Sequence, residues 1–122
     1  MFISIGFNSI VADTKIMFTQ INLHKTKEAS GQLTRVLSQR HTCVAMVQEP
    51  WLHENSIRGL SNSGRVFCQT GGRARTCVIV RGLHAELVPK HTSRDLTTVR
   101  VRWTDVEGAT REMLVASSYL HG

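Results

Sequence analysis

Acidic residues and proline are scarce in this sequence, and both shortages narrow the class of protein. Only 9 of the 122 residues are Asp or Glu against 15 Lys or Arg, so the formal net charge is +6. Two prolines together with 41% hydrophobic residues exclude a disordered or fibrous chain and indicate one globular domain. A domain of this length buries about two-thirds of its unfolded surface, so it needs neither disulfides nor a structural metal. The excess of basic residues predicts attraction to polyanions, of which nucleic acid is the first candidate.

Cysteine is also scarce, and its spacing argues against two kinds of site. Cys43, Cys68 and Cys77 are an odd number, and each lies in an apolar run. They are interpreted as reduced residues of the core, which favours an intracellular location. The sequence lacks closely spaced ligand pairs for zinc and the Gly-x-Ser-x-Gly turn of serine hydrolases, and Gly71-Gly72 lacks the Walker spacing. It therefore does not support a zinc site or a serine or cysteine nucleophile.

The first residues show no targeting pattern. Residues 1–7 are apolar, but no basic leader precedes them, and Asn8, Ser9 and Asp13 interrupt the run long before it could span a bilayer. We therefore expect neither a signal peptide nor a membrane anchor. Residues 1–14 are interpreted as a leader or an extra strand, and residues 15–122 as the main domain.

Residues 16 to 50 have the pattern of a strand, a helix and a second strand. Residues 16–23 are rich in branched and aromatic side chains, and residues 25–40 repeat apolar side chains at helical spacing. Residues 43–47 form a short apolar run, typical of a strand covered on both faces, which Pro50 ends. Such a βαβ unit has a right-handed crossover and parallel strands. Both strands should therefore end at the same edge of the sheet.

The rest of the chain has a pattern of strands alone. After a loop expected at residues 53–63, four apolar runs are bounded by Gly, Pro, Asp or Ser: residues 65–69, 75–81 with a return through 83–88, 96–103 and 111–120. The clearest hairpin joins residues 98–103 to residues 112–116. Arg100 and Arg102 alternate with apolar residues there and are interpreted as the solvated face of a half-exposed strand. The predicted fold class is α/β, with one βαβ unit followed by antiparallel strands.

Two polar residues follow the strands of the βαβ unit. Asn22 ends the first strand and Glu49 follows the second. Neighbouring strands run about 4.8 Å apart, so an amide and a carboxylate at their ends can converge on one small ligand. Mg²⁺ is often held by one or two carboxylates, water and a substrate phosphate, which with the basic charge indicates phosphodiester chemistry. Two simpler interpretations stay open: Asn22 satisfies backbone groups of its loop, and Glu49 is a solvated strand end.

Four short motifs, each weak alone, follow one another along the chain. They are Gln-Ile-Asn-Leu at residues 20–23, Val-Ala-Met-Val-Gln-Glu-Pro-Trp at 44–51, a strand after Gly71-Gly72, and Val-Ala-Ser-Ser-Tyr-Leu at 115–120. Together they resemble the endonuclease domain of non-LTR retrotransposons, a branch of the endonuclease/exonuclease/phosphatase superfamily that also contains apurinic endonucleases and pancreatic deoxyribonuclease. The resemblance runs from about residue 15 to the last residue. Its strongest part is the spacing of the first two motifs.

The resemblance implies an α/β sandwich of two sheets with helices outside, and a Mg²⁺-dependent cut in DNA. In this family the nick is made in the nucleus, and its 3′ hydroxyl primes the reverse transcriptase of the same polyprotein. Matched by motif, Glu49 corresponds to the magnesium-binding glutamate, Asn22 to the asparagine beside it, and Tyr119 to the tyrosine that contacts the scissile phosphate. His24 is a departure, because apurinic relatives often carry an acidic residue two positions after the asparagine.

The resemblance extends over the amino-terminal half of such a domain. The family's later motifs, an Asp-x-Asn element and a closing histidine, have no counterpart before Gly122. We therefore expect residues 1–122 alone to lack robust nuclease activity. The inner apolar face of a half sandwich predicts self-association or docking of the missing half. Two alternatives stay open: a non-catalytic nucleic-acid-binding module that uses Arg73 and Arg75, and a remnant that serves protein interaction alone.

Overall fold

Branched side chains and a capped amphipathic helix produce the predicted βαβ unit. The computed structural model describes residues 2–11 and 14–120, with side chains from Ile16 onward. Strand β2 (Thr14–Asn22) lies parallel to β3 (Cys43–Gln48), with Met17 opposite Cys43 at the start of the ladder. Helix α1 (Lys27–Ser38) connects them and begins two residues later than predicted, because the Thr26 side chain caps it by accepting from the Ala29 N–H.

The other elements are one strand before this unit and a series of strands with one 3₁₀ turn after it. They are β1 (Phe2–Val11), β4 (Leu52–His53), β5 (Ser56–Ile57), β6 (Arg65–Phe67), β7 (Thr76–Arg81), β8 (His84–Leu87), the 3₁₀ turn Pro89–His91, β9 (Leu96–Thr104) and β10 (Thr110–Ser118). Strand β6 is shorter than predicted and ends at Phe67. The loop expected at residues 53–63 contains the small β4–β5 hairpin, whose turn residues Glu54 and Asn55 both have positive φ. Without glycine, that turn has no sequence signature.

The larger sheet has the strand order β1-β2-β3-β7-β6, and the described backbone places β1 and β6 at its edges. Strand β1 pairs antiparallel with β2, from Phe2 opposite Asn22 to Val11 opposite Thr14. It lies within residues 1–14, which were interpreted from the sequence as either a leader or an extra strand. Strand β7 is antiparallel to β3, so β7 begins where β3 ends.

Alternate side chains of the larger sheet enter two different cores. In β3, Cys43, Ala45 and Val47 face α1, where they pack with Leu33 and Leu37. The intervening residues of the larger sheet, including Val44 of β3 and Val78 and Val80 of β7, face the other way and pack against the second sheet. A strand covered on both faces has no polar side, which explains the continuous apolar run in β3.

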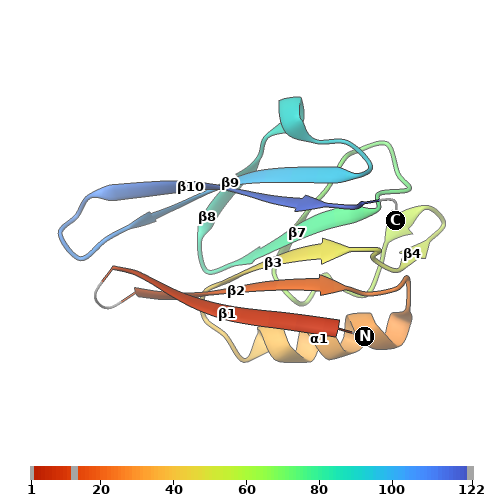
Figure 1. Cartoon of the computed structure of the whole chain (residues 1–122), viewed down its shortest axis with the longest axis horizontal. Helices are drawn as coiled ribbons and strands as arrows, with labels where there is room; N and C mark the ends of the chain where they lie inside the picture. The colour runs from red at the N-terminus through yellow and green to blue at the C-terminus, as the bar shows by residue number, and fades with distance from the viewer. Residues whose placement is uncertain (1, 12–13, 121–122) are drawn as a thin grey trace.

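The smaller sheet has the order β10-β9-β8 and packs on the larger sheet. Figure 1 shows the resulting layers, with α1 below the larger sheet and the β9–β10 hairpin above it. The β9–β10 hairpin forms over the predicted residues, and it pairs Val99 with Val115, both of which are buried between the sheets. Since Ser118 lies opposite Leu96, the end of β10 and the start of β9 meet at one place. The ends of β2, β3 and β10 and the starts of β7 and β9 thus form one end of the sandwich, called here the strand-end rim.

Candidate functional site

A cavity of about 450 Å³ opens at the strand-end rim. Five segments line it, contributing Lys25 after β2, Glu49, Pro50 and Leu52 after β3, Arg73, Ala74 and Arg75 before β7, Arg94 before β9, and Tyr119 after β10. Two of the three residues predicted for the site, Glu49 and Tyr119, therefore line one cavity although they lie far apart in the sequence.

Glu49 is held in place by its backbone. Its N–H donates to the Arg75 carbonyl at 2.9 Å, and its own carbonyl accepts from the Lys25 N–H at 2.9 Å. The side chain is 20% exposed, and its Oε2 lies 3.6 Å from Nδ1 of His24. Glu49 is thus a partly buried carboxylate in a cavity rather than a solvated strand end.

Asn22 lies at the expected end of β2, and its side-chain oxygen is engaged by its own loop. It lies opposite Gln48 in the β2–β3 ladder, and its Oδ1 accepts from the His24 N–H at 2.8 Å. The cavity lining does not include it. Asn22 therefore accepts a hydrogen bond from the backbone of its own loop, which is one of the two interpretations of Asn22 that the sequence allowed. This bond stabilises the turn that carries His24 and Lys25.

Tyr119 is held by the neighbouring segment before β9. Its N–H donates to the Asp95 carbonyl at 2.8 Å, and the Arg75 guanidinium lies 5.5 Å from the centre of its ring. The Arg75 Nε in turn lies 3.5 Å from Oδ1 of Asp95. The phenol therefore belongs to a small group with one cation and one carboxylate.

Strained backbone gathers in the loops of the strand-end rim. In the described residues, positive φ at non-glycine positions occurs at His24, Lys25, Glu49, Glu54, Asn55 and Arg73. The turn at Asn55 is joined to this rim, because its carbonyl accepts from the Arg73 N–H at 2.8 Å. Such conformations cost about 1–3 kcal/mol each and tend to gather at functional sites. No glycine signals them, so the sequence does not reveal them.

Buried hydrogen bonds join the two sheets beneath the cavity. Gln48 Nε2 donates to Ser117 Oγ at 3.0 Å, and Ser117 Oγ donates to the Val47 carbonyl at 2.8 Å. The hydroxyls of Thr76 and Thr97 lie 2.8 Å apart, and both side chains are fully buried. Directional bonds of this kind fix the offset of the two sheets and so the relative positions of the loops above.

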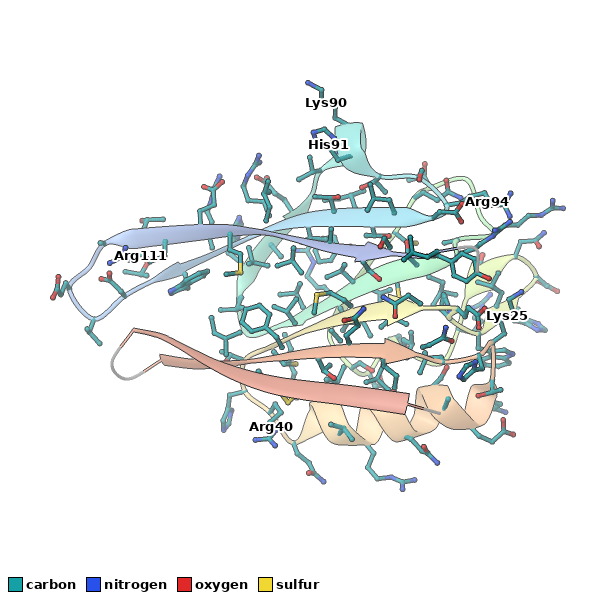
Figure 2. All side chains as sticks on the ribbon, in the orientation of Figure 1. Lys25, Arg40, Lys90, His91, Arg94 and Arg111 are labelled. Atoms are coloured by element: carbon teal, nitrogen blue, oxygen red, sulfur yellow. The ribbon has the colours of Figure 1, made fainter. Side chains whose placement is uncertain are left out.

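The rim carries more positive than negative charge. Lys25, Arg73, Arg75 and Arg94 line the cavity with one carboxylate, Glu49. Figure 2 shows Lys25 and Arg94 at the same end of the molecule, whereas Arg111 lies at the opposite end. Of these cations, Arg73 and Arg75 were named from the sequence only for the binding alternative, and Lys25 and Arg94 were not named. The signal available was that each cation lies within two residues of a predicted strand end.

The donor set suits one kind of metal better than others. The described residues hold no cluster of three or more His, Cys, Asp or Glu side chains, which are the ligands that zinc requires. A lone carboxylate in a cationic cavity suits Mg²⁺, which keeps several waters and completes its shell with substrate phosphates. The cysteines do not contribute, because burial raises the pKa of the Cys43 and Cys77 thiols and keeps them protonated.

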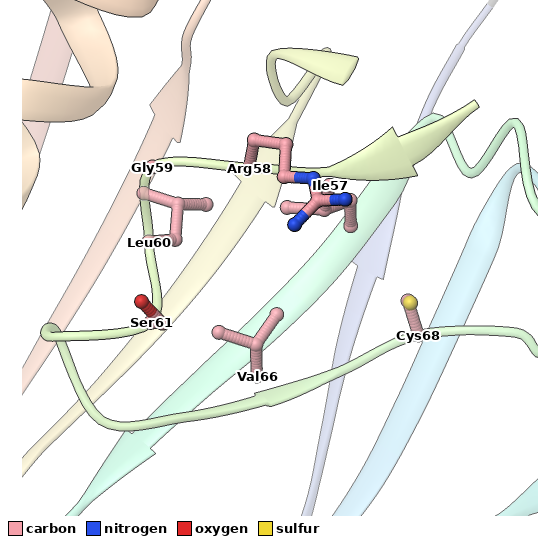
Figure 3. A pocket seen from close by; sticks show the side chains of 7 residues that line it. All are labelled: Ile57, Arg58, Gly59, Leu60, Ser61, Val66 and Cys68. Atoms are coloured by element: carbon pink, nitrogen blue, oxygen red, sulfur yellow. The ribbon is translucent and has the colours of Figure 1, made fainter. Parts of the chain in front are cut away.

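A second cavity of about 320 Å³ lies between the segment after β5 and strand β6. Figure 3 shows its lining of Ile57, Arg58, Gly59, Leu60, Ser61, Val66 and Cys68. Burial raises the pKa of the Cys68 thiol, so it stays protonated near neutral pH. Arg58 is the one charged side chain of this lining, and no carboxylate opposes it. This cavity lacks the paired acid and cation chemistry of the rim.

The fold and the rim together define a partial α/β sandwich with a cationic cavity at its strand ends. Among solved structures, the chain is similar to the endonuclease domain of TRAS1, a telomere-specific non-LTR retrotransposon, with a TM-score of 0.64 and 24% identity. The match covers 85% of this chain and 45% of that domain, so the chain spans less than half of the domain's length. The chain therefore has the fold of part of a retrotransposon endonuclease domain, as the sequence motifs predicted.

In comparisons by sequence, neither a protein-family model nor a curated protein matches the chain. The described residues also contain no helix that is long and apolar enough to cross a membrane.

Proposed function

We propose that this chain is part of a Mg²⁺-dependent DNA endonuclease of a non-LTR retrotransposon polyprotein, and that its rim cavity binds the phosphodiester backbone of DNA. The observation that carries the proposal is the convergence of Glu49, Tyr119 and four cationic side chains on one cavity. A phosphodiester needs the same combination: cations for its charge, a hydrogen-bond donor for its oxygens, and a carboxylate to hold a metal. In a complete element this DNA would be the nuclear target of reverse transcription.

Each residue then has a chemical task. Glu49 holds Mg²⁺, which when bound polarises the phosphate and stabilises the leaving oxygen. The phenol of Tyr119 donates a hydrogen bond to an oxygen of the scissile phosphate. Lys25, Arg73 and Arg94 bind neighbouring phosphates, which fixes the register of the backbone on the protein without reading its sequence. Asn22 keeps the loop after β2 in the shape that presents Lys25.

We further propose that these 122 residues alone do not cut DNA. Hydrolysis needs a group that orients and deprotonates the attacking water. The carboxylate of Glu49 is assigned to the metal, and the adjacent His24, whose side chain is 57% exposed, has that same carboxylate as its acidic partner at 3.6 Å. Neither group is therefore assigned to the attacking water. The remaining groups belong to the part of the domain that this chain does not span.

The test combines a magnesium titration with a nicking assay. Calorimetric titration of the chain with MgCl₂, with a short DNA duplex present, is expected to show metal-dependent heat that Glu49→Gln removes. Glu112→Gln is the matched control, because it makes the same change on the outer face of the β9–β10 hairpin. Supercoiled plasmid is expected to stay intact. Equal heats in both variants would overturn the metal assignment, and Mg²⁺-dependent nicking that Glu49→Gln abolishes would overturn the proposed inactivity.

A second candidate is a nucleic-acid-binding module without catalysis. The excess of arginine at the rim favours it, since phosphate binding by Lys and Arg needs no metal. DNA affinity that falls steeply with salt but is the same for the wild type and Glu49→Gln, with or without Mg²⁺, would support this candidate over the first.

A third candidate is a protein-interaction surface on the smaller sheet. Strand β10 lies at the end of that sheet, and its Leu114 is 59% exposed. Unpaired strand edges with apolar side chains favour association with another chain. Reversible self-association in light scattering, without DNA binding at physiological salt, would favour this candidate.

A further inference from the structure

Arg75 connects Glu49 and Tyr119, the two predicted site residues that line the rim cavity. Its carbonyl accepts from the N–H of Glu49 at 2.9 Å, and its guanidinium lies 5.5 Å from the ring centre of Tyr119. Its own N–H donates to the Arg94 carbonyl at 2.8 Å. The backbone of Arg75 is therefore held on both sides, and its side chain is directed toward the tyrosine.

Asp95 holds the same group from the other side. Its carboxylate Oδ1 lies 3.5 Å from Nε of Arg75, and its carbonyl accepts from the N–H of Tyr119 at 2.8 Å. Asp95 thus contacts both the guanidinium of Arg75 and the backbone N–H of Tyr119. Asp95 is half-buried, and it does not line the cavity in which Arg75 and Tyr119 both lie.

We infer that Asp95 is a positioning residue that acts through Arg75 and keeps the Tyr119 ring at the mouth of the rim cavity. A planar guanidinium can lie near an aromatic face while it forms an ion pair with a carboxylate, an arrangement that a lysine ammonium does not reproduce. The inference rests on the proposed function, because it matters for catalysis only if the phenol contacts phosphate. Holding the phenol before DNA arrives reduces the ordering that binding requires.

The arrangement also divides the cations of the rim into two groups. Arg75 has its charge opposed by Asp95, so its main effect is on the tyrosine. Lys25, Arg73 and Arg94 are exposed side chains of the lining, and they are the ones available to DNA phosphates. The inference therefore predicts that changing Asp95 alters the tyrosine before it alters general attraction to DNA.

The test uses the fact that the chain contains a single tyrosine. With ring-labelled tyrosine, the NMR spectrum of the full chain holds the ring signals of Tyr119 alone. Asp95→Asn and Arg75→Lys are each expected to move and broaden these signals, and Asp95→Glu is expected to restore part of the wild-type position. Glu86→Gln removes a similar arginine partner on the outer face and should leave the signals in place.

Backbone amide spectra identify variants that have lost the fold. If Asp95→Asn does not fold, Arg75→Lys provides the test in its place. Unchanged ring signals in the folded variants would overturn the inference. Adding a short DNA duplex tests the proposed function separately. Wild-type ring signals that do not shift when DNA is added would refute the phosphate contact of Tyr119. A shift caused by Asp95→Asn in the free protein would still establish the positioning role.

Discussion

Two groups of arginine in this molecule differ in what opposes their charge. On the outer face of the smaller sheet, Arg100 and Arg102 alternate with Glu86 and Glu112 in a network with N–O distances of 2.7 to 3.6 Å. Two cations meet two carboxylates there, and the hydrogen bond from Arg100 lowers the pKa of the Glu86 carboxyl. At the strand-end rim, four cations meet Glu49 and Asp95, which leaves two positive charges in excess.

Because the two groups differ in how much of their charge is opposed by carboxylates, the number of arginines alone does not mark a binding site. The outer-face network satisfies itself, and exposed ion pairs of this kind contribute about 0–1 kcal/mol to stability and little field to the surroundings. The rim concentrates unopposed charge around a concave surface, where it attracts polyanions more strongly than a flat surface does. The comparison can be tested by removing equal charge from each group.

The largest expected effect is on DNA affinity. We expect Arg73→Gln/Arg94→Gln to weaken duplex binding by roughly tenfold at moderate salt. The slope of log affinity against log salt should also fall, by about 0.9 for each phosphate that the variant no longer neutralises. Arg100→Gln/Arg102→Gln lowers the net charge by the same two units. It is expected to change affinity by less than about twofold, since these residues do not line the rim cavity and salt screens charges that lie away from the bound DNA.

Fluorescence anisotropy with a labelled duplex at several salt concentrations measures both quantities. An equal decrease of affinity in the two double variants would mean that net charge alone governs binding. In that case the rim would have no special role, and the comparison between the two groups would fail.

The fold was largely predictable because its signals are local. The apolar runs at β3 and β7 and the alternation at β9 follow from whether a strand is covered on one face or two. The hairpin predicted between residues 98–103 and 112–116 is present as β9 and β10. The β4–β5 hairpin was missed, because Glu54 and Asn55 adopt positive φ without a glycine to signal it.

The candidate site was predictable only in part, because it is assembled from distant segments. The position of Glu49 follows from the parallel strands, and Tyr119 was assigned by resemblance to a motif. Asn22 lies at the expected strand end, but its Oδ1 is engaged by the His24 N–H, a detail of loop shape that residue spacing does not contain. Arg94 and Asp95 were missed, since their relation to Glu49 depends on how the two sheets are offset. Lys25 was missed because its position depends on the shape of the loop after β2, whose backbone bonds to Glu49.

A smaller effect concerns the stability of the two regions. Thr97→Val removes a buried hydroxyl that contacts the hydroxyl of Thr76, and we expect the free energy of unfolding to fall by about 1–2 kcal/mol. The double variant Thr76→Val/Thr97→Val should be destabilised no more than the single one, because it leaves no unpaired hydroxyl. Arg100→Gln, in the exposed network, should be destabilised less than Thr97→Val, because solvent screens the ion pairs that it loses. Urea unfolding of the three variants measures these values, and a larger effect in Arg100→Gln would reverse the ranking of the two regions.

The smallest effect appears only in acid and concerns the turn of the β9–β10 hairpin, beyond the outer-face network. The Asp105 carboxylate is 2% exposed and accepts from the N–H groups of Ala109 and Glu107 and from Arg111 Nε, at 2.9 to 3.0 Å. These bonds, the one from Ala109 first, lower the pKa of its carboxyl in the folded state. The stabilisation is therefore present above the pKa of an unfolded aspartate, about 3.9, and is lost as the pH falls through the lower folded value. Urea midpoints at pH 6, 4 and 3 should fall less steeply for Asp105→Asn than for the wild type, with Glu86→Gln as the exposed control. Parallel curves for the wild type and Asp105→Asn would show that the turn does not contribute to acid sensitivity.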